Sequence, residues 1–145
     1  MVNKNRQTDY LSGREETLLI IDQDYLMREL LSDILTLNGY NVILALNPAH
    51  AKMIYHSKKE TIDLVLSDID FEGLGSLISD VTSQYPTPML IFTKDKLAKK
   101  NPPTFIGFTI LQKPFDVLEL FKAIRKSLDE NNATASNQSA GHHLA

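Results

Sequence analysis

Five short apolar runs divide the chain, and each is followed by a polar or amphipathic stretch. The runs occupy residues 17–22, 41–46, 63–68, 88–93 and 108–113. Nearly continuous hydrophobicity over so few residues is typical of strands that are covered on both faces. Such strands occur mainly in parallel sheets flanked by helices. The runs therefore predict a five-stranded parallel sheet.

Helical spacing appears between most of these strands. Apolar residues recur every three or four positions, as they do on the buried face of a helix. The spacing predicts helices over residues 25–37, from Asn47 to about residue 55, around residues 74–81, and from Asp116 to about residue 128. A fourth helix, after Thr93, is expected to be short because two prolines end it. Alternating strands and helices predict an α/β fold with a doubly wound parallel sheet.

The length of 145 residues fits one domain with one core. We expect the folded domain to cover residues 17–129. Residues 1–16 and 130–145 lack apolar periodicity and are rich in polar residues, which predicts a flexible tail at each end. The C-terminal tail could also be a linker. The chain is accordingly either a stand-alone domain or part of a longer protein.

Composition excludes several kinds of site. There is no cysteine, so any metal must be held by oxygen or imidazole ligands. No segment is apolar enough for a signal peptide or a membrane span, which makes the cytoplasm the expected location. The 15 Lys and Arg residues are dispersed in a chain of formal net charge -3, so nucleic acid is not expected as a direct ligand. A local cluster from Lys94 to Lys100 is interpreted as a solvated helix face.

Polar side chains follow the predicted strands where each one ends. In a parallel sheet these carboxyl ends meet along one edge, which is where ligands bind. The strand ends carry Asp22, Gln23 and Asp24, then Asp68 and Asp70, then Thr93, and finally Lys113 with Pro114. A single aspartate in such a place is more often a turn or a helix cap. Together, however, the set suits Mg²⁺-assisted phosphorylation of Asp68, with Thr93 and Lys113 contacting the phosphoryl group.

The segments "LLIIDQDYLMRELL", "DLVLSDIDFEGLGSL", "PMLIFTK" and "ILQKPF" make the chain similar to the receiver domains of two-component response regulators. The resemblance covers about residues 17–129. It implies a flavodoxin-like fold with strand order 2-1-3-4-5. It also implies that Asp68 is the phosphoacceptor, that Thr93 is the family's hydroxyl residue, and that Lys113 is the family's lysine, joined to Pro114 by a cis bond.

The resemblance further implies Mg²⁺ as the cofactor, held by Asp22, Asp68 and the backbone carbonyl of Asp70. The implied partner is a histidine kinase or a histidine phosphotransfer protein, and the implied role is signalling rather than enzymatic turnover. A homodimer through the fourth helix, fifth strand and fifth helix is a further implication.

Two departures from the family pattern concern the metal site and the signalling face. Gln23 occupies the place of a second metal-site acid, which should weaken Mg²⁺ binding because hard cations depend on ligand charge. Asp24 or Asp70 could compensate. Ile110 replaces the aromatic switch residue, and Phe108 lies on the same side of that strand.

Two alternatives remain open at this stage. A degenerate receiver would act without phosphorylation as a binding or dimerisation module, which Gln23 and Ile110 favour. The stretch "DIDFEG" also resembles the first motif of haloacid dehalogenase-type phosphatases, with Asp68 as nucleophile and Asp70 as general acid. In that family the nucleophile strand comes first in the chain, whereas here other strand-end acids precede Asp68.

Overall fold

The computed structural model describes residues 11–70, 72–83, 87–94 and 108–144. Five parallel strands form one sheet in the order β2-β1-β3-β4-β5, which confirms the predicted topology. The strands are β1 (Thr17–Ile21), β2 (Asn41–Ala45), β3 (Leu64–Asp68), β4 (Met89–Thr93) and β5 (Phe108–Gln112). Because β1, β3 and β4 are almost entirely buried, their side chains can be apolar on both faces.

Three of the four described helices begin at a capping side chain. The helices are α1 (Tyr25–Leu37), α2 (Pro48–Lys58), α3 (Leu74–Ser83) and α5 (Val117–Leu144). Asp24, Asn47 and Asp116 each accept a hydrogen bond from a backbone N–H in the first turn of α1, α2 and α5. Gly39 follows α1 with a φ of 95°, a left-handed conformation that glycine adopts without strain.

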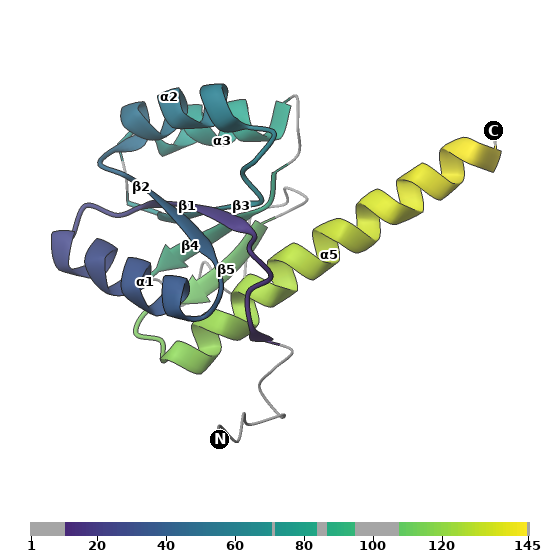
Figure 1. Cartoon of the computed structure of the whole chain (residues 1–145). Coiled ribbons are helices and arrows are strands. Elements are labelled where there is room, and N and C mark those ends of the chain that lie inside the picture. The colour runs from purple at the N-terminus through teal and green to yellow at the C-terminus, as the bar shows by residue number, and fades with distance from the viewer. Residues whose placement is uncertain (1–10, 71, 84–86, 95–107, 145) are drawn as a thin grey trace, which may run out of the picture.

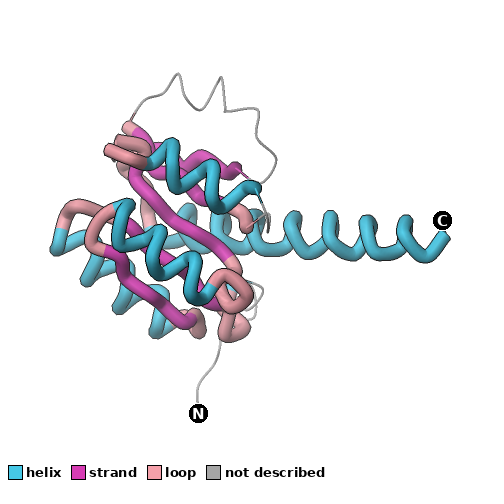
Figure 2. The backbone as a smooth tube through the Cα atoms, turned by 90° about the horizontal axis from the view of Figure 1, so that it is seen from above, coloured by secondary structure: helices cyan, strands magenta, loops and turns pink. Residues whose placement is uncertain are grey.

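Two layers of helices cover the sheet (Figures 1 and 2). On one face, α1 and α5 pack against side chains such as Leu18, Ile20 and Phe92. On the other face, α2 and α3 pack against side chains such as Leu19, Val65 and Ile91. Phe108 and Ile110 both pack against this second layer, as their shared side of the strand predicts. The sheet is therefore the central layer of three, and its carboxyl edge is left for the loops.

The described structure continues on both sides of residues 17–129. Residues 11–16 lie against the domain: Leu11 is buried, and the backbone N–H of Gly13 donates to the carbonyl of Asn38 at 2.7 Å. At the other end, α5 continues through the predicted tail to Leu144 and extends beyond the sheet (Figures 1 and 2). None of the described helices is long and apolar enough to cross a membrane. The predicted fourth helix lies outside the described residues.

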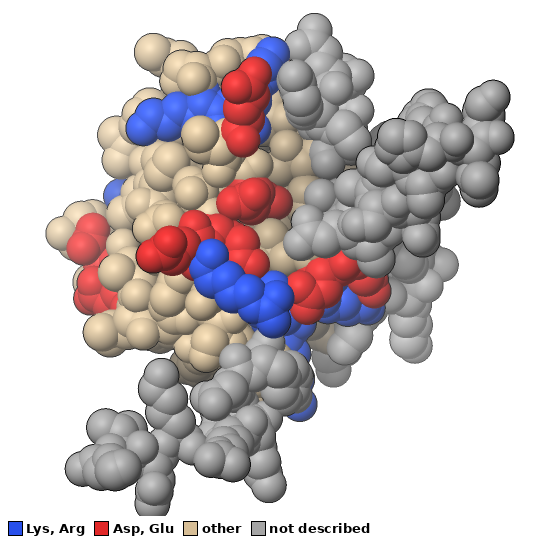
Figure 3. All heavy atoms as spheres, turned by 45° about the vertical axis from the view of Figure 1, so that its right-hand side comes forward, with Lys and Arg blue, Asp and Glu red and all other residues tan. Residues whose placement is uncertain are grey.

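Arg125 ties the N-terminal segment to α5. Its guanidinium forms ion pairs with Glu16, at 2.5 Å, and with Asp129, at 2.7 Å. Burial tends to raise the pKa of Glu16, but hydrogen bonds from the Arg14 N–H and from Arg125 outweigh it and leave this pKa lowered. Glu16 directly precedes β1, so this cluster lies at the amino end of the sheet. Basic and acidic side chains also lie side by side on the face drawn in Figure 3.

Candidate functional site

A cavity of about 260 Å³ lies at the carboxyl edge of the sheet. Its walls come from the ends of β1, β3, β4 and β5, which are far apart in sequence. The lining residues are Asp22, Gln23, Asp24, Asp68, Asp70, Lys94 and Lys113. Six of these seven are the strand-end residues that the sequence singles out. Four carboxylates therefore face two ammonium groups in a single cavity.

Asp68 and Lys113 form the central contact of this cavity. The Lys113 Nζ lies 2.6 Å from Asp68 Oδ2, while Asp68 Oδ1 accepts a hydrogen bond from the Asp70 N–H at 2.9 Å. The side chain of Lys113 is 17% exposed and that of Asp68 is 22% exposed, so the pair is shielded but can still be reached from solvent. The Lys113–Pro114 peptide bond is cis, as the resemblance implies. The Lys113 N–H donates to the carbonyl of Thr93 at 2.7 Å, which fixes the end of β5 against β4.

Asp22 is a buried carboxylate with one unused oxygen. Its Oδ1 accepts a hydrogen bond from the Asp24 N–H at 2.9 Å, but Oδ2 is buried and has no hydrogen-bond partner among the described residues. Burial raises the pKa of Asp22, and the negative charge of Asp68 adds to this rise. The Asp24 N–H and Lys113 act in the opposite direction and offset part of it. A buried carboxylate oxygen without a partner is energetically costly, and a bound cation would offset that cost.

The donors around Asp22 suit a small hard cation. Mg²⁺ takes one or two carboxylates and completes its shell with waters or phosphate oxygens. Asp22 Oδ2 is an orphaned buried oxygen that points to such a ligand, and Asp68 supplies a second carboxylate in the same cavity. Within the described residues, no three Asp, Glu or His side chains converge on one point. The two carboxylates of Asp22 and Asp68 fit a Mg²⁺ ion that keeps the rest of its shell as water or phosphate oxygens.

Asp24 and Gln23 follow Asp22 directly, but they add less negative charge to the cavity than these positions suggest. Asp24 Oδ1 accepts hydrogen bonds from the N–H groups of Leu26 and Met27, so this carboxylate serves as the cap of α1. Gln23 is exposed at the rim and carries no charge. Arg28 reaches back from α1 and donates to the carbonyls of Asp22, at 2.6 Å, and Gln23, at 3.3 Å. These contacts hold the loop that presents Asp22.

Thr93 is placed next to the site but not on its wall. It ends β4, is buried, and pairs with Gln112 on β5. It is absent from the described residues that line the cavity. Its predicted contact with a phosphoryl group therefore stays a prediction.

Sequence reasoning missed two cations of the site, Lys94 and Arg28. Lys94 lines the cavity, although its neighbours in the sequence suggest a solvated helix face. Its position directly after the strand-end Thr93 is the signal that could have identified it. Arg28 carries a weaker signal, namely a basic residue one turn after the cap of α1, where it can reach the carbonyls of the preceding loop.

Known proteins resemble this chain in both sequence and fold. The regulatory protein VirG of Rhizobium rhizogenes is 28% identical over 124 residues, which cover 81% of this chain. The structure of the chemotaxis response regulator CheY4 of Vibrio cholerae is 26% identical, with a TM-score of 0.66 over 77% of this chain and 98% of that one. The response regulator PhyR from Brucella abortus has a TM-score of 0.76 over 96% of this chain and 57% of PhyR, and at 19% identity it shows the fold alone.

The matches differ in how much of each relative they include. The chain spans 50% of the length of VirG and 28% of the length of two further curated regulators. No protein-family model matches the chain. Solved receiver domains, by contrast, are matched over nearly their whole length, including a signal receiver domain from Pseudomonas fluorescens that is 25% identical over 86% of this chain and 94% of that one.

Proposed function

The chain is a receiver domain of the response-regulator type, and on that premise we propose that it accepts a phosphoryl group on Asp68. Phosphorylation would then pass a signal on through a conformational change or through partner binding. The donor would be a histidine kinase or a histidine phosphotransfer protein. In this role Asp68 is a modified residue of a signalling module, and the chain is not an enzyme that turns over phosphoesters.

The contact between Lys113 and Asp68 carries this proposal. An ammonium 2.6 Å from Asp68 Oδ2 can neutralise the negative charge of a phosphoryl group as it arrives. One carboxylate oxygen of Asp68 forms the new bond to phosphorus, and the bond from phosphorus to the donor breaks with its electron pair on the donor. The Asp70 N–H holds the other carboxylate oxygen, so the nucleophile is oriented before the donor arrives.

Asp22 and Asp68 would hold Mg²⁺, with the carbonyl of Asp70 as a further ligand. The bound ion would neutralise phosphoryl oxygens that the two lysines cannot cover alone. Asp22 contributes its unpaired Oδ2, whose burial leaves it without another partner among the described residues. Gln23 would lower the affinity for Mg²⁺ because an amide brings no charge to the site.

The test of phosphorylation is intact mass after incubation with Mg²⁺ and acetyl phosphate. We expect a gain of one phosphoryl group in the wild type and none in Asp68→Asn, because the amide is not a nucleophile at this position. Asp70→Asn is the matched control, since it lies in the same loop and removes a carboxylate that does not accept the phosphoryl group. Labelling of Asp68→Asn at the wild-type level would refute the assignment of Asp68.

A degenerate receiver is the second candidate, and Gln23 is the observation that favours it. In this case the domain would bind its partner or a second copy without phosphorylation. The distinguishing measurement is a titration with Mg²⁺ and beryllofluoride, which imitates the phosphoryl group. No mass gain together with no beryllofluoride-induced change would favour the degenerate receiver.

A further inference from the structure

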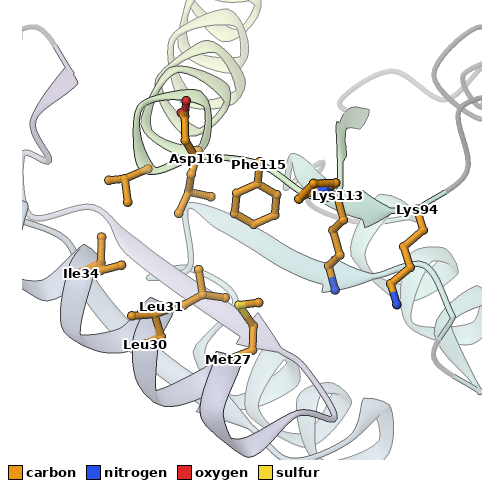
Figure 4. Close-up of a pocket in the computed structure, with 11 residues that line it drawn as sticks. Met27, Leu30, Leu31, Ile34, Lys94, Lys113, Phe115 and Asp116 are labelled. Atoms are coloured by element: carbon orange, nitrogen blue, oxygen red, sulfur yellow. The ribbon is translucent and has the colours of Figure 1, made fainter.

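A second cavity, of about 480 Å³, lies between α1 and the start of α5. Met27, Leu30 and Ile34 on α1 line one wall, and Phe115 lies across from them (Figure 4). Val117 at the first turn of α5 adds to the apolar lining. This volume is within the range of small-molecule sites in proteins. We call this cavity the α1–α5 groove.

The α1–α5 groove leaves apolar side chains open to solvent. Leu30 is 52% exposed and Val117 is 46% exposed, although both are large apolar residues. Contiguous exposed apolar surface rimmed by polar residues is typical of ligand-binding grooves. The groove thus offers apolar surface that a ligand could cover.

Lys94 and Lys113 line both the α1–α5 groove and the cavity of Asp68. Their side chains run close together at one end of the groove, as Figure 4 shows. Lys94 has no ion pair with any described residue, whereas Lys113 contacts Asp68. The groove therefore combines an apolar body with a cationic end, and that end adjoins the phosphoacceptor. Charge complementarity selects a ligand that has one anionic end and an apolar remainder.

We propose that the α1–α5 groove is an acyl-chain site for small phosphodonors, namely acyl phosphates whose apolar chain lies between α1 and Phe115. The phosphoryl group would then lie against Lys94 and Lys113, beside Asp68. This inference rests on the proposed phosphorylation of Asp68, to which it adds the class of a small-molecule donor. Acetyl phosphate has too short a chain to fill the groove.

The transfer step is balanced without a further reactant. A carboxylate oxygen of Asp68 forms a bond to phosphorus, and the bond between phosphorus and the acyl oxygen breaks. The electron pair of that bond stays on the acyl oxygen, and the leaving group departs as a carboxylate anion. Lys113 and Lys94 neutralise negative charge on the phosphoryl group and on the leaving carboxylate. Burial of the donor's acyl chain in the groove lowers the donor concentration that is needed for labelling of Asp68.

The experiment compares acetyl, butyryl and octanoyl phosphate as donors, with Mg²⁺ present and intact mass as the readout. Because each buried methylene strengthens binding roughly fourfold, we expect the second-order rate constant of labelling to rise at least about tenfold from acetyl to octanoyl phosphate. Equal rate constants for the three donors would overturn the inference. Equal rate constants are also expected if the groove binds only a helix of a partner protein.

Leu30→Glu places a charge in the α1–α5 groove and should abolish the preference for the longer chain. Labelling by acetyl phosphate should stay at the wild-type rate in this variant, since Leu30 does not line the Asp68 cavity. Leu37→Glu is the matched control, because Leu37 is an exposed leucine on the same helix that lies outside the groove. A preference that persists in Leu30→Glu would contradict the assignment of the groove.

A binding measurement separates this inference from the proposed function. Octylphosphonate, a stable analogue, should bind Asp68→Asn at least about tenfold more tightly than methylphosphonate, with amide shifts at Leu30 and Val117. If no acyl phosphate labels Asp68, the proposed function fails but this binding still tests the groove. If acetyl phosphate labels Asp68 and octylphosphonate leaves both amides unchanged, only the acyl-chain site is refuted.

Discussion

At the amino end of the sheet, Arg125 is enclosed by Glu16 and Asp129, whereas at the carboxyl end Lys113 meets Asp68 on the wall of an open cavity. Both cations pair with a carboxylate from a distant part of the chain. The Arg125 side chain is only 4% exposed and pairs with both carboxylates, although its Nε is buried without a hydrogen-bond partner among the described residues. The Asp68 cavity instead holds four carboxylates against two lysines, and Asp22 Oδ2 has no hydrogen-bond partner among the described residues.

This difference separates a charge cluster that stabilises the fold from one that is prepared for a ligand. A closed cluster gains nothing from an added ion, since every charged group already has a partner. The open cluster has an excess of negative charge, so a cation or a cationic group completes it. Substitutions at the amino end should therefore change stability, and substitutions at the carboxyl end should change ligand binding and phosphorylation.

The largest effect is expected for Arg125→Met. Removing the guanidinium leaves Glu16 without its partner in a shielded position, which should lower the free energy of unfolding by about 3–5 kcal/mol. Urea unfolding followed by circular dichroism measures this loss. Asp129→Asn is the control: its side chain is 54% exposed, so the loss should be under about 1 kcal/mol. A small loss in Arg125→Met would show that the cluster is not structural.

Lys113→Met should slow phosphorylation strongly and change the stability of the fold little. Without the ammonium, nothing at 2.6 Å from Asp68 neutralises the phosphoryl group, and the rate of labelling by acetyl phosphate should fall about a hundredfold. The free energy of unfolding should change by only about 1 kcal/mol, because the pair is partly exposed. Lys94→Met serves as the matched variant and should slow labelling much less. Equal losses in the two variants would contradict a special role for Lys113.

Gln23→Asp should add a negative charge to the Asp68 cavity. We expect the dissociation constant for Mg²⁺ to fall about tenfold, which calorimetric titration can measure. Gln23→Asn keeps the site neutral and should leave the constant unchanged. If Gln23→Asp has no effect either, another acid such as Asp24 or Asp70 already supplies that charge.

The smallest effect is expected for Asp22→Asn without metal. Burial raises the pKa of Asp22, so the folded state holds this proton more tightly than the unfolded state does. The associated stability is present at low pH and is lost as the pH rises through the raised pKa. At neutral pH the wild type therefore bears the cost of a buried anion, and the variant should be about 1 kcal/mol more stable.

Two further conditions check the Asp22→Asn prediction by urea unfolding. The advantage of the variant should shrink as the pH is lowered, because Asp22 becomes neutral in the wild type as well. Added Mg²⁺ should stabilise the wild type more than the variant, since only the wild type keeps the second carboxylate. A variant that is less stable than the wild type at neutral pH would refute a buried, unpaired Asp22.

The sequence predicts the sheet well because its signal is local. Residues 18–21 and 64–66 are apolar without interruption, and such short runs are typical of strands buried on both faces. Once the strands are parallel, the meeting of Asp22, Asp68 and Lys113 follows from topology rather than from any fine detail. The helix starts at Asn47 and Asp116 are equally local, since each cap bonds within its own first turn.

Contacts made by long side chains or across the fold could not be predicted in the same way. Arg28 and Lys94 reach the site through flexible stems, and their spacing in sequence does not say which way those stems turn. Residues 11–16 carry no apolar periodicity, yet Leu11 is buried and Glu16 pairs with Arg125 from the far end of the chain. Such contacts depend on tertiary placement, which local patterns do not encode.

Helix α5 reaches well past the core that holds it. Leu120, Ile124 and Leu128 are buried against the sheet, and the helix continues from Leu128 to Leu144, about 24 Å further at 1.5 Å per residue. A small tilt of the packed part of α5, beside the α1–α5 groove, would therefore displace Leu144 more than it displaces Leu128.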